Sequence, residues 1–199
     1  MAAVLAISVI LLVAGASLLT GSGRQSRKAG ADLLAGMIEQ ARTAAITTRS
    51  HVVLAVAEPG DLADDDGRCR LGLFRVETWP ALPTDPVEAV LMGRWRTLET
   101  GVILIGGEVD GVANPLDNDE LTISCGTARP LTVRAHAIGF NPRGGRHYPP
   151  GSGAVTLRLA EGNYREGKAT AYQHGGSGVI AENHLKIGRV TARPYHIDG

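Results

Sequence analysis

The first twenty positions of the chain are apolar or small throughout, in the run MAAVLAISVILLVAGASLLT, and none of them is charged. A helix rises about 1.5 Å per residue, so about 20 such residues cross a bilayer core of about 30 Å. This pattern predicts a membrane-spanning helix over residues 1–23. The alternative is a cleaved signal peptide, because Ala14, Gly15 and Ala16 are typical of a cleavage site, although no Lys or Arg precedes the run.

The pattern then changes to that of an amphipathic helix over residues 24–50. Its apolar positions lie 4, 3 and 4 residues apart and therefore share one helical face. They are Leu34, Ile38, Ala41 and Ala45. Because no proline occurs before residue 59, we expect one helix from residue 1 to about residue 48; the alternative is two helices separated at residues 21–23. Only the second half has a polar face, so only this half is expected to lie on a soluble domain.

Beyond residue 50 the apolar residues occur in short runs that are rich in Val, Ile and Leu. Clusters of Gly, Pro, Asn and Asp separate these runs and are typical of turns. The predicted strands cover residues 51–57, 70–77, 90–97, 102–105, 121–125, 137–140, 154–159, 169–172 and 185–192. The fold class expected for the chain is therefore α+β. A long N-terminal helix, membrane-spanning in its first half, would pack on an antiparallel β-sheet head that comprises residues 51–199.

Several short motifs follow one another along this layout. They are Ala41–Ile46 followed by a strand at Val52; Trp95, Leu98, Gly101, Val102 and Leu104; Ile138–Gly144 followed by a strand at Val155; and Ile187–Val190. In order and spacing they resemble the GspH- and FimT-type pseudopilins, which are pilin-like subunits of type II secretion pseudopili and type IV pilus-like filaments. The resemblance covers nearly the whole chain. It implies a pilin-like fold and the structural role of a minor pseudopilin, with no enzymatic activity.

The resemblance also implies a location and a set of partners. The protein would be a single-pass protein of the inner membrane with its head on the periplasmic side, and its partners would be other pseudopilins. The residues expected to pack the helix in a filament are Leu5, Leu12, Leu34, Ile38, Ala41 and Ala45. Prepilins carry a basic leader and an F-T-L-x-E motif, at which a prepilin peptidase acts and where methylation is expected, and both are absent here. We therefore expect the authentic start to lie upstream.

Charge and motif content change this interpretation little. Lys plus Arg and Asp plus Glu both number 20, so the net charge gives no reason to expect a nucleic-acid partner. The six histidines form no metal-ligand motif, and no nucleophile elbow or phosphate loop occurs, so we expect no catalytic, cofactor or metal site. Two alternatives stay open. One is a DNA-binding minor pilin that uses Arg189 and Arg193, and the other is a membrane-anchored β-domain enzyme of unknown type.

The chain has two cysteines, Cys69 and Cys125. A pseudopilin head would lie outside the cytoplasm, where thiols are oxidised. Both cysteines are at the ends of predicted strands, so a disulfide between them is one expectation. The alternative is that both are small buried hydrophobic residues, as free cysteines often are.

Overall fold

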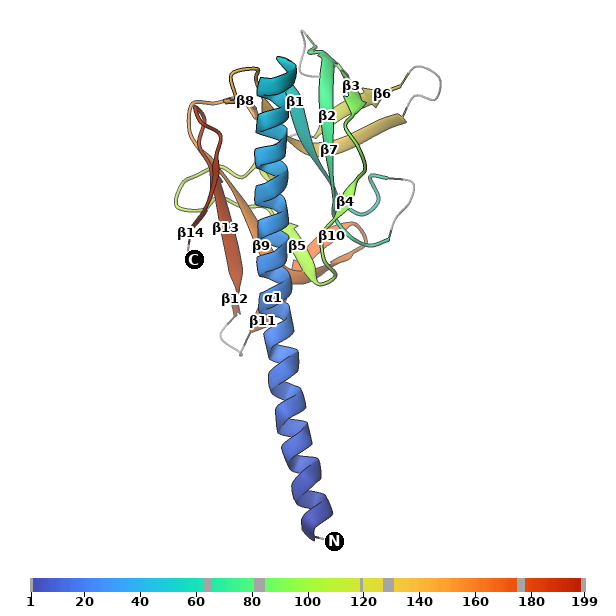
Figure 1. Ribbon diagram of the computed structural model, residues 1–199, viewed down its shortest axis with the longest axis vertical. Helices are drawn as coiled ribbons and strands as arrows, with labels where there is room; N and C mark the ends of the chain where they lie inside the picture. The colour runs from blue at the N-terminus through green and yellow to red at the C-terminus, as the bar shows by residue number, and fades with distance from the viewer. Residues whose placement is uncertain are drawn as a thin grey trace.

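The computed structural model describes residues 2–62, 66–80, 85–118, 120–126, 131–174 and 178–197, and all of their side chains except those of residues 2–22, 131 and 174. One helix, α1 (Ala2–Thr48), and two principal β-sheets make up this part of the chain. From residue 23 onward α1 runs along the head with the two sheets on either side of it (Figure 1). As in the sequence analysis, the term head refers to residues 51–199.

The C-terminal end of α1 has a clear local cause. Arg49 has a left-handed backbone (φ 52°), and its N–H donates to the carbonyl of Ile46 at 3.4 Å, which closes the last turn. The β-branched residues that follow favour an extended chain. The helix therefore ends at Thr48, where the change of periodicity predicts its end.

The predicted fold class is wrong. Strands dominate the described residues, and they form two sheets that contact α1 on different sides instead of one antiparallel sheet beneath it. From residue 23 onward, charged residues recur along the helix, including Arg24, Arg27, Lys28 and Asp32. Within the described residues, no helix combines the length and the apolar character that a bilayer crossing requires. The predicted transmembrane segment and single-pass inner-membrane location are contradicted by this finding.

The first sheet closes on itself. Five of its strands form a ring in the order β1–β2–β3–β6–β7, because β7 pairs back to β1. All these pairs are antiparallel except β3–β6, which is parallel. The strands β4 and β8 extend the ring at β2 and β7. The bounds are β1 Val52–Ala57, β2 Arg70–Thr78, β3 Val87–Leu91, β4 Arg96–Thr97, β6 Leu121–Cys125, β7 Leu131–Phe140 and β8 Arg146–Tyr148.

Strand β1 separates two hydrophobic cores, and this explains why its sequence is apolar at every position. Every residue of β1 is buried. Val52, Leu54 and Val56 pack in the core beneath α1, whereas the alternate residues face the interior of the ring. Interior positions are often alanine, as at Ala55 and Ala135, which suits the narrow space that five strands enclose.

The second sheet holds the other side of α1. Its central strand, β9, pairs with β5, β10 and β13, and β14 lies at the edge beside β13. The bounds are β5 Val102–Ile105, β9 Val155–Arg165, β10 Lys168–Ala171, β13 Glu182–Ile187 and β14 Pro194–Ile197. A separate pair, β11 (Gln173–His174) and β12 (Val179–Ile180), and a short 3-10 helix, η1 (Pro115–Asp117), complete the described elements.

An ion pair joins α1 to this second sheet. Arg27 is only 8% exposed. Its Nη1 lies 2.6 Å from a carboxylate oxygen of Glu161 on β9, and its Nε donates to Asn183 on β13 at 2.6 Å. Glycine allows this close approach, because a Cβ at Gly23 would lie 2.5 Å from the Glu161 carboxylate.

Candidate functional site at the C-terminal end of the helix

A tight hairpin follows β7, and Asn141 organises it. The Asn141 side-chain oxygen accepts hydrogen bonds from the backbone N–H groups of Arg143 (2.9 Å) and Gly145 (3.1 Å). The Asn141 N–H donates to the Gly145 carbonyl at 2.9 Å, and its own carbonyl accepts from Gly144 at 2.8 Å. An asparagine with this pattern stabilises the loop through hydrogen bonds within the loop itself.

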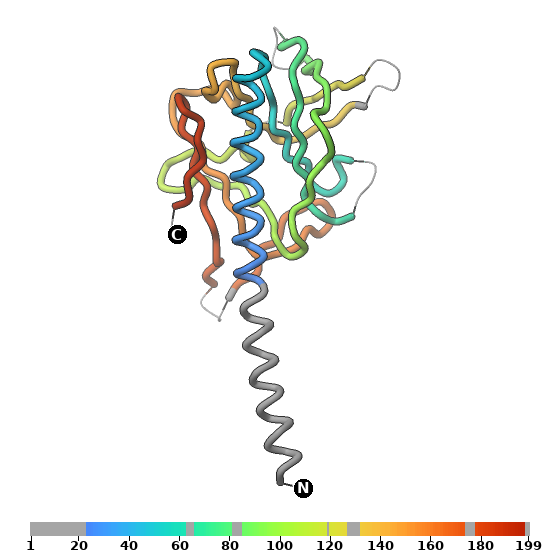
Figure 2. Tube along the Cα trace, viewed as in Figure 1, coloured from blue at the N-terminus to red at the C-terminus, as the bar shows by residue number. Residues whose placement is uncertain are grey.

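The hairpin packs directly against the end of α1. Gly144 has φ +79°, and a Cβ there would lie 2.7 Å from the Ile46 side chain, so the contact requires glycine. Arg42 on the same helical turn donates from Nε to the carbonyl of Thr191 at 2.6 Å. Figure 2 shows the end of α1 and the hairpin at the same end of the molecule.

Three of the sequence motifs therefore meet at one place. The backbone N–H of Arg146 donates to the carbonyl of Arg189 at 2.7 Å, which joins the hairpin to the segment that follows β13. The helix end, the hairpin and this segment contain the motifs Ala41–Ile46, Ile138–Gly144 and Ile187–Val190. We call this place the helix-end joint.

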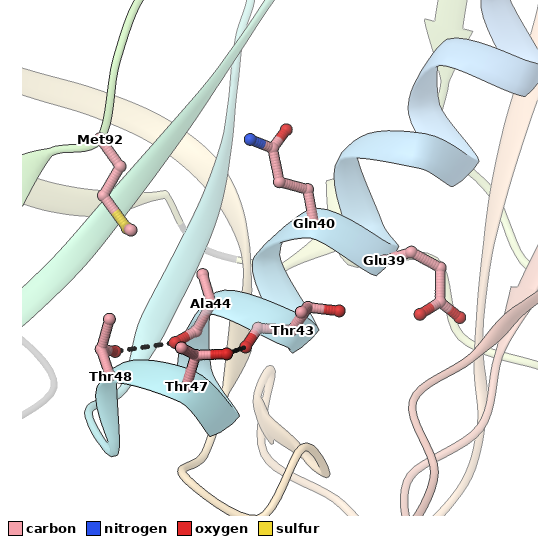
Figure 3. A pocket seen from close by; sticks show the side chains of 7 residues that line it. All are labelled: Glu39, Gln40, Thr43, Ala44, Thr47, Thr48 and Met92. Atoms are coloured by element: carbon pink, nitrogen blue, oxygen red, sulfur yellow. Dashed lines mark hydrogen bonds between the residues drawn. The ribbon is translucent and has the colours of Figure 1, made fainter.

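An open groove lies beside α1 near this joint (Figure 3). Its helical wall consists of Glu39, Gln40, Thr43, Ala44, Thr47 and Thr48, and Met92 faces them from the segment after β3. The hydroxyls of Thr47 and Thr48 donate to the carbonyls four residues earlier, each at 2.8 Å, and so have partners within the helix itself. The surface of the groove is mostly apolar.

The same side of the helix carries a regular stripe of small or uncharged residues, which we call the outer stripe. Their spacings alternate between 4 and 3, which is the repeat of a helix seam that faces another helix. They are Ala29, Leu33, Gly36, Gln40, Thr43 and Thr47. Leu33 is partly buried, and the others are exposed. A Cβ at Gly36 would meet nothing within 4 Å, so the middle of this outer stripe is open.

The apolar residues predicted to pack the filament lie on the opposite face. Leu34, Ile38, Ala41 and Ala45 are all fully buried in the core beneath α1. They stabilise the head itself, and their side chains are not available at its surface to a neighbouring subunit. Leu5 and Leu12 fall in the part of α1 whose side chains lie outside the described residues.

A basic hollow occupies the other side of the helix-end joint. Its basic lining residues are Arg143, Arg146, His147 and Arg189, and none of the described residues that line it is acidic. Of Arg189 and Arg193, the two residues named for the DNA-binding alternative, only Arg189 lines this hollow. Arg193 is exposed but does not line it, so the structure does not bring the two together.

Arg146 is the least expected member of this hollow. It is only 5% exposed, and its guanidinium donates to the carbonyls of Pro149, Gly151 (3.4 Å) and Gly153 (2.8 Å). Its Nε is buried without a hydrogen-bond partner among the described residues. Burial, with a smaller contribution from the positive charge of Arg189, lowers the pKa of Arg146.

The two cysteines lie in different cores. Cys69 packs beneath α1, and Cys125 packs in the interior of the ring. Both are buried and free, so the predicted disulfide is not formed in the structure. Burial raises the pKa of both thiols, which makes them behave as small hydrophobic residues.

Sequence reasoning missed Met92 and the burial of Arg146. Met92 lies inside one predicted strand, 90–97, which the structure divides into β3 and β4 near Gly93 (φ +99°). Arg146 follows the hairpin motif directly, but its burial depends on the loop 149–153, whose position is not encoded by any local periodicity. Among the described residues, no group of three or more His, Cys, Asp or Glu side chains is arranged to hold a metal ion.

Comparisons with known proteins add no relative to this description. No protein-family model matches the chain, and neither the curated proteins nor the solved structures give a significant match.

Proposed function

We propose that this protein is a structural subunit of a pilin-like filament, with the role of a minor pseudopilin. The outer stripe of α1 and the groove beside Met92 would receive a helix of a neighbouring subunit. The observation that carries the proposal is the two-sided character of α1. One face is buried in the head, while the opposite face is open and carries small residues at helix-seam spacing next to an apolar groove.

Two physical arguments support this use of the outer stripe. A residue such as Gly36 or Ala29 lets a second helix approach closely, because it places little or no side chain between the two backbones. An apolar groove also gains free energy when a partner excludes water from it, at roughly 25 cal/mol per Å² of apolar surface. In this role the subunit positions its neighbours and catalyses no reaction.

The test is cross-linking of the full chain in cells of the organism that naturally produces it. Gln40→Cys and Thr43→Cys place a thiol on the outer stripe, and Thr78→Cys is the matched control at an exposed position of β2. The native cysteines are buried and contribute little background. A maleimide–benzophenone reagent reacts with the introduced thiol and, on illumination, with C–H bonds of the protein beside it. It should join the stripe variants to a second pilin-like subunit, whereas Thr78→Cys should give no such product.

A bulky substitution gives the complementary measurement. Gly36→Arg should abolish incorporation into filaments, because the arginine side chain would occupy the seam, while Thr78→Arg should not. Both variants should keep the circular dichroism spectrum of the unmodified protein, and neither should melt at a clearly lower temperature, since arginine is a better helix former than glycine at the exposed position 36. Normal incorporation of a folded Gly36→Arg variant, together with equal cross-linking of all three cysteine positions, would refute the proposal.

A further inference from the structure

The basic hollow differs from other places in the structure where arginine is buried or half-buried. Arg27 pairs with Glu161, and Arg158 pairs with Glu182, each at 2.6 Å. In both places a carboxylate supplies the opposite charge. In the hollow, by contrast, the described lining residues include three arginines and no carboxylate.

Arg146 is the arginine for which this excess of positive charge matters most, because its guanidinium is buried. The carbonyl oxygens of residues 149, 151 and 153 accept its protons, but a carbonyl carries no net charge that could compensate the guanidinium. A buried charge is costly unless an opposite charge lies near it. The charged neighbour that acts on Arg146 is Arg189, which has the same sign.

The other two arginines are free to reach a ligand. Arg143 and Arg189 are exposed, and neither guanidinium has a hydrogen bond or an ion pair with any described residue. The backbone on either side of the hollow is fixed, because Asn141 holds the hairpin and Arg146 N–H holds residue 189. The hollow is therefore a preformed concavity of about 480 Å³ lined by two exposed arginines whose guanidinium groups have no partner among the described residues.

We propose that this hollow binds a tetrahedral oxyanion dianion, either inorganic phosphate or the phosphate group of a monoester. Guanidinium groups bind phosphate through paired, charge-assisted hydrogen bonds. A dianion compensates the charge of the three arginines better than a monovalent carboxylate does. Arg143 and Arg189 contact the anion, and Arg146 acts from beneath as a fixed positive charge. The site does not depend on the filament role of α1.

Calorimetric titration of the purified full chain tests this site. The probes are inorganic phosphate, glycerol phosphate and acetate, each at constant ionic strength maintained with chloride. Phosphate should bind saturably with one site per chain, and acetate should bind at least about tenfold more weakly. Tighter binding of glycerol phosphate than of phosphate assigns the site to a monoester, and the reverse order assigns it to the free ion.

Three variants locate the binding. Arg189→Gln and Arg143→Gln should each weaken phosphate binding by about tenfold, because each removes a charged ligand. Arg193→Gln is the control, an exposed arginine outside the hollow, and should change binding less than about twofold. Because all three substituted positions are exposed, the variants should keep Arg146 in place and the fold intact. Equal melting temperatures of the variants and the unmodified protein check this.

Several results would overturn the proposal. Absence of saturable phosphate binding would do so, as would equal losses for Arg189→Gln and Arg193→Gln. A single-stranded oligonucleotide without terminal phosphate provides the last comparison. If it binds in a salt-sensitive way while phosphate neither binds nor competes, the arginines form a general surface for polyanions and the dianion site is refuted.

Discussion

Single residues in this protein often have roles that their type alone does not reveal, and glycine shows this well. Gly144 has a left-handed backbone and lies against Ile46, so both its conformation and its missing side chain are needed. Gly36 is helical and open to solvent, so neither property is needed for the fold of the head. The same residue type is thus structurally required at one position and only tolerated at the other.

Alanine substitutions at these two glycines should therefore have opposite effects on the free energy of unfolding. Gly144→Ala should lower it by about 1–3 kcal/mol, because a Cβ is strained at positive φ and collides with Ile46. Gly36→Ala should raise it by about 0.5–1 kcal/mol, because alanine favours an exposed helix. Urea unfolding followed by circular dichroism measures both. Equal signs for the two changes would contradict the structure at the hairpin.

Glu58 is a second residue with a testable role. Burial raises the pKa of its carboxyl to about 7, and the negative charges of Asp61 and Glu120 add to this shift. The folded state therefore binds the proton more tightly than the unfolded chain. The stability that this gives is fully present below the ordinary carboxyl pKa and is lost as pH rises through about 7.

Glu58→Gln should remove this part of the pH dependence. Relative to that variant, the unmodified protein should lose about 1 kcal/mol of stability between pH 5 and pH 8, a value reduced for the partial exposure of the carboxyl. The comparison between the two proteins cancels the opposite trend of His51 and His147, whose pKa values burial lowers. Exposed Glu88→Gln is the control and should leave the pH profile unchanged.

At the scale of elements, α1 depends on both of its neighbouring sheets, and the link to the second sheet is polar. The Arg27–Glu161 pair is largely buried, with side chains 10% and 14% exposed. Removing one partner of such a pair leaves a desolvated charge, which costs more than the pair itself contributes. The helix is thus held to β9 by a contact that no apolar periodicity predicts.

Arg27→Met should lower the free energy of unfolding by about 2–4 kcal/mol, whereas the exposed Arg24→Met should change it by less than about 0.5 kcal/mol. The double variant Arg27→Met, Glu161→Gln should be less unstable than the sum of the single changes, because the two side chains interact directly. Additive effects would show that the ion pair contributes nothing beyond its separate parts.

The strands that sequence reasoning located are those with a strong local pattern. Residues 121–125 and 102–105 coincide with β6 and β5, because each is a short apolar run between turn residues. Strands β8 and β14 were missed, since three or four mixed residues carry no periodicity. The closure of the ring through the parallel pair β3–β6 was also missed, because pairing between distant strands depends on tertiary packing.

The candidate site was predicted only in part. The buried stripe of α1 follows from its spacing, and the structure places Leu34, Ile38, Ala41 and Ala45 in the core beneath the helix. Arg143, Arg146 and Arg189 are separated along the sequence, and no spacing groups them. The hairpin brings the three arginines together around one hollow. The tertiary fold determines that no Asp or Glu is among the described residues that line it. Local sequence carries neither kind of information.

At the scale of the whole molecule, the two hydrophobic cores share their walls. Strands β1, β2 and β7 each place some residues beneath α1 and others inside the ring. Separating the cores would require these strands to lose one set of contacts while they keep the other. Because interiors are closely packed, we expect no stable intermediate in which one core is intact and the other is open.

The cysteines allow this expectation to be tested, since each reports on one core. In Cys125→Ala only Cys69 remains, beneath α1, and in Cys69→Ala only Cys125 remains, inside the ring. Thiol labelling across a urea series should give a midpoint in each variant that coincides with the circular dichroism midpoint of the same variant. A Thr78→Cys substitution in a cysteine-free background is the control and should react fully without urea, because that position is exposed. If Cys125 became reactive well before the loss of β-structure while Cys69 stayed protected, the ring would open on its own. The shared strands β1, β2 and β7 would then not couple the two cores.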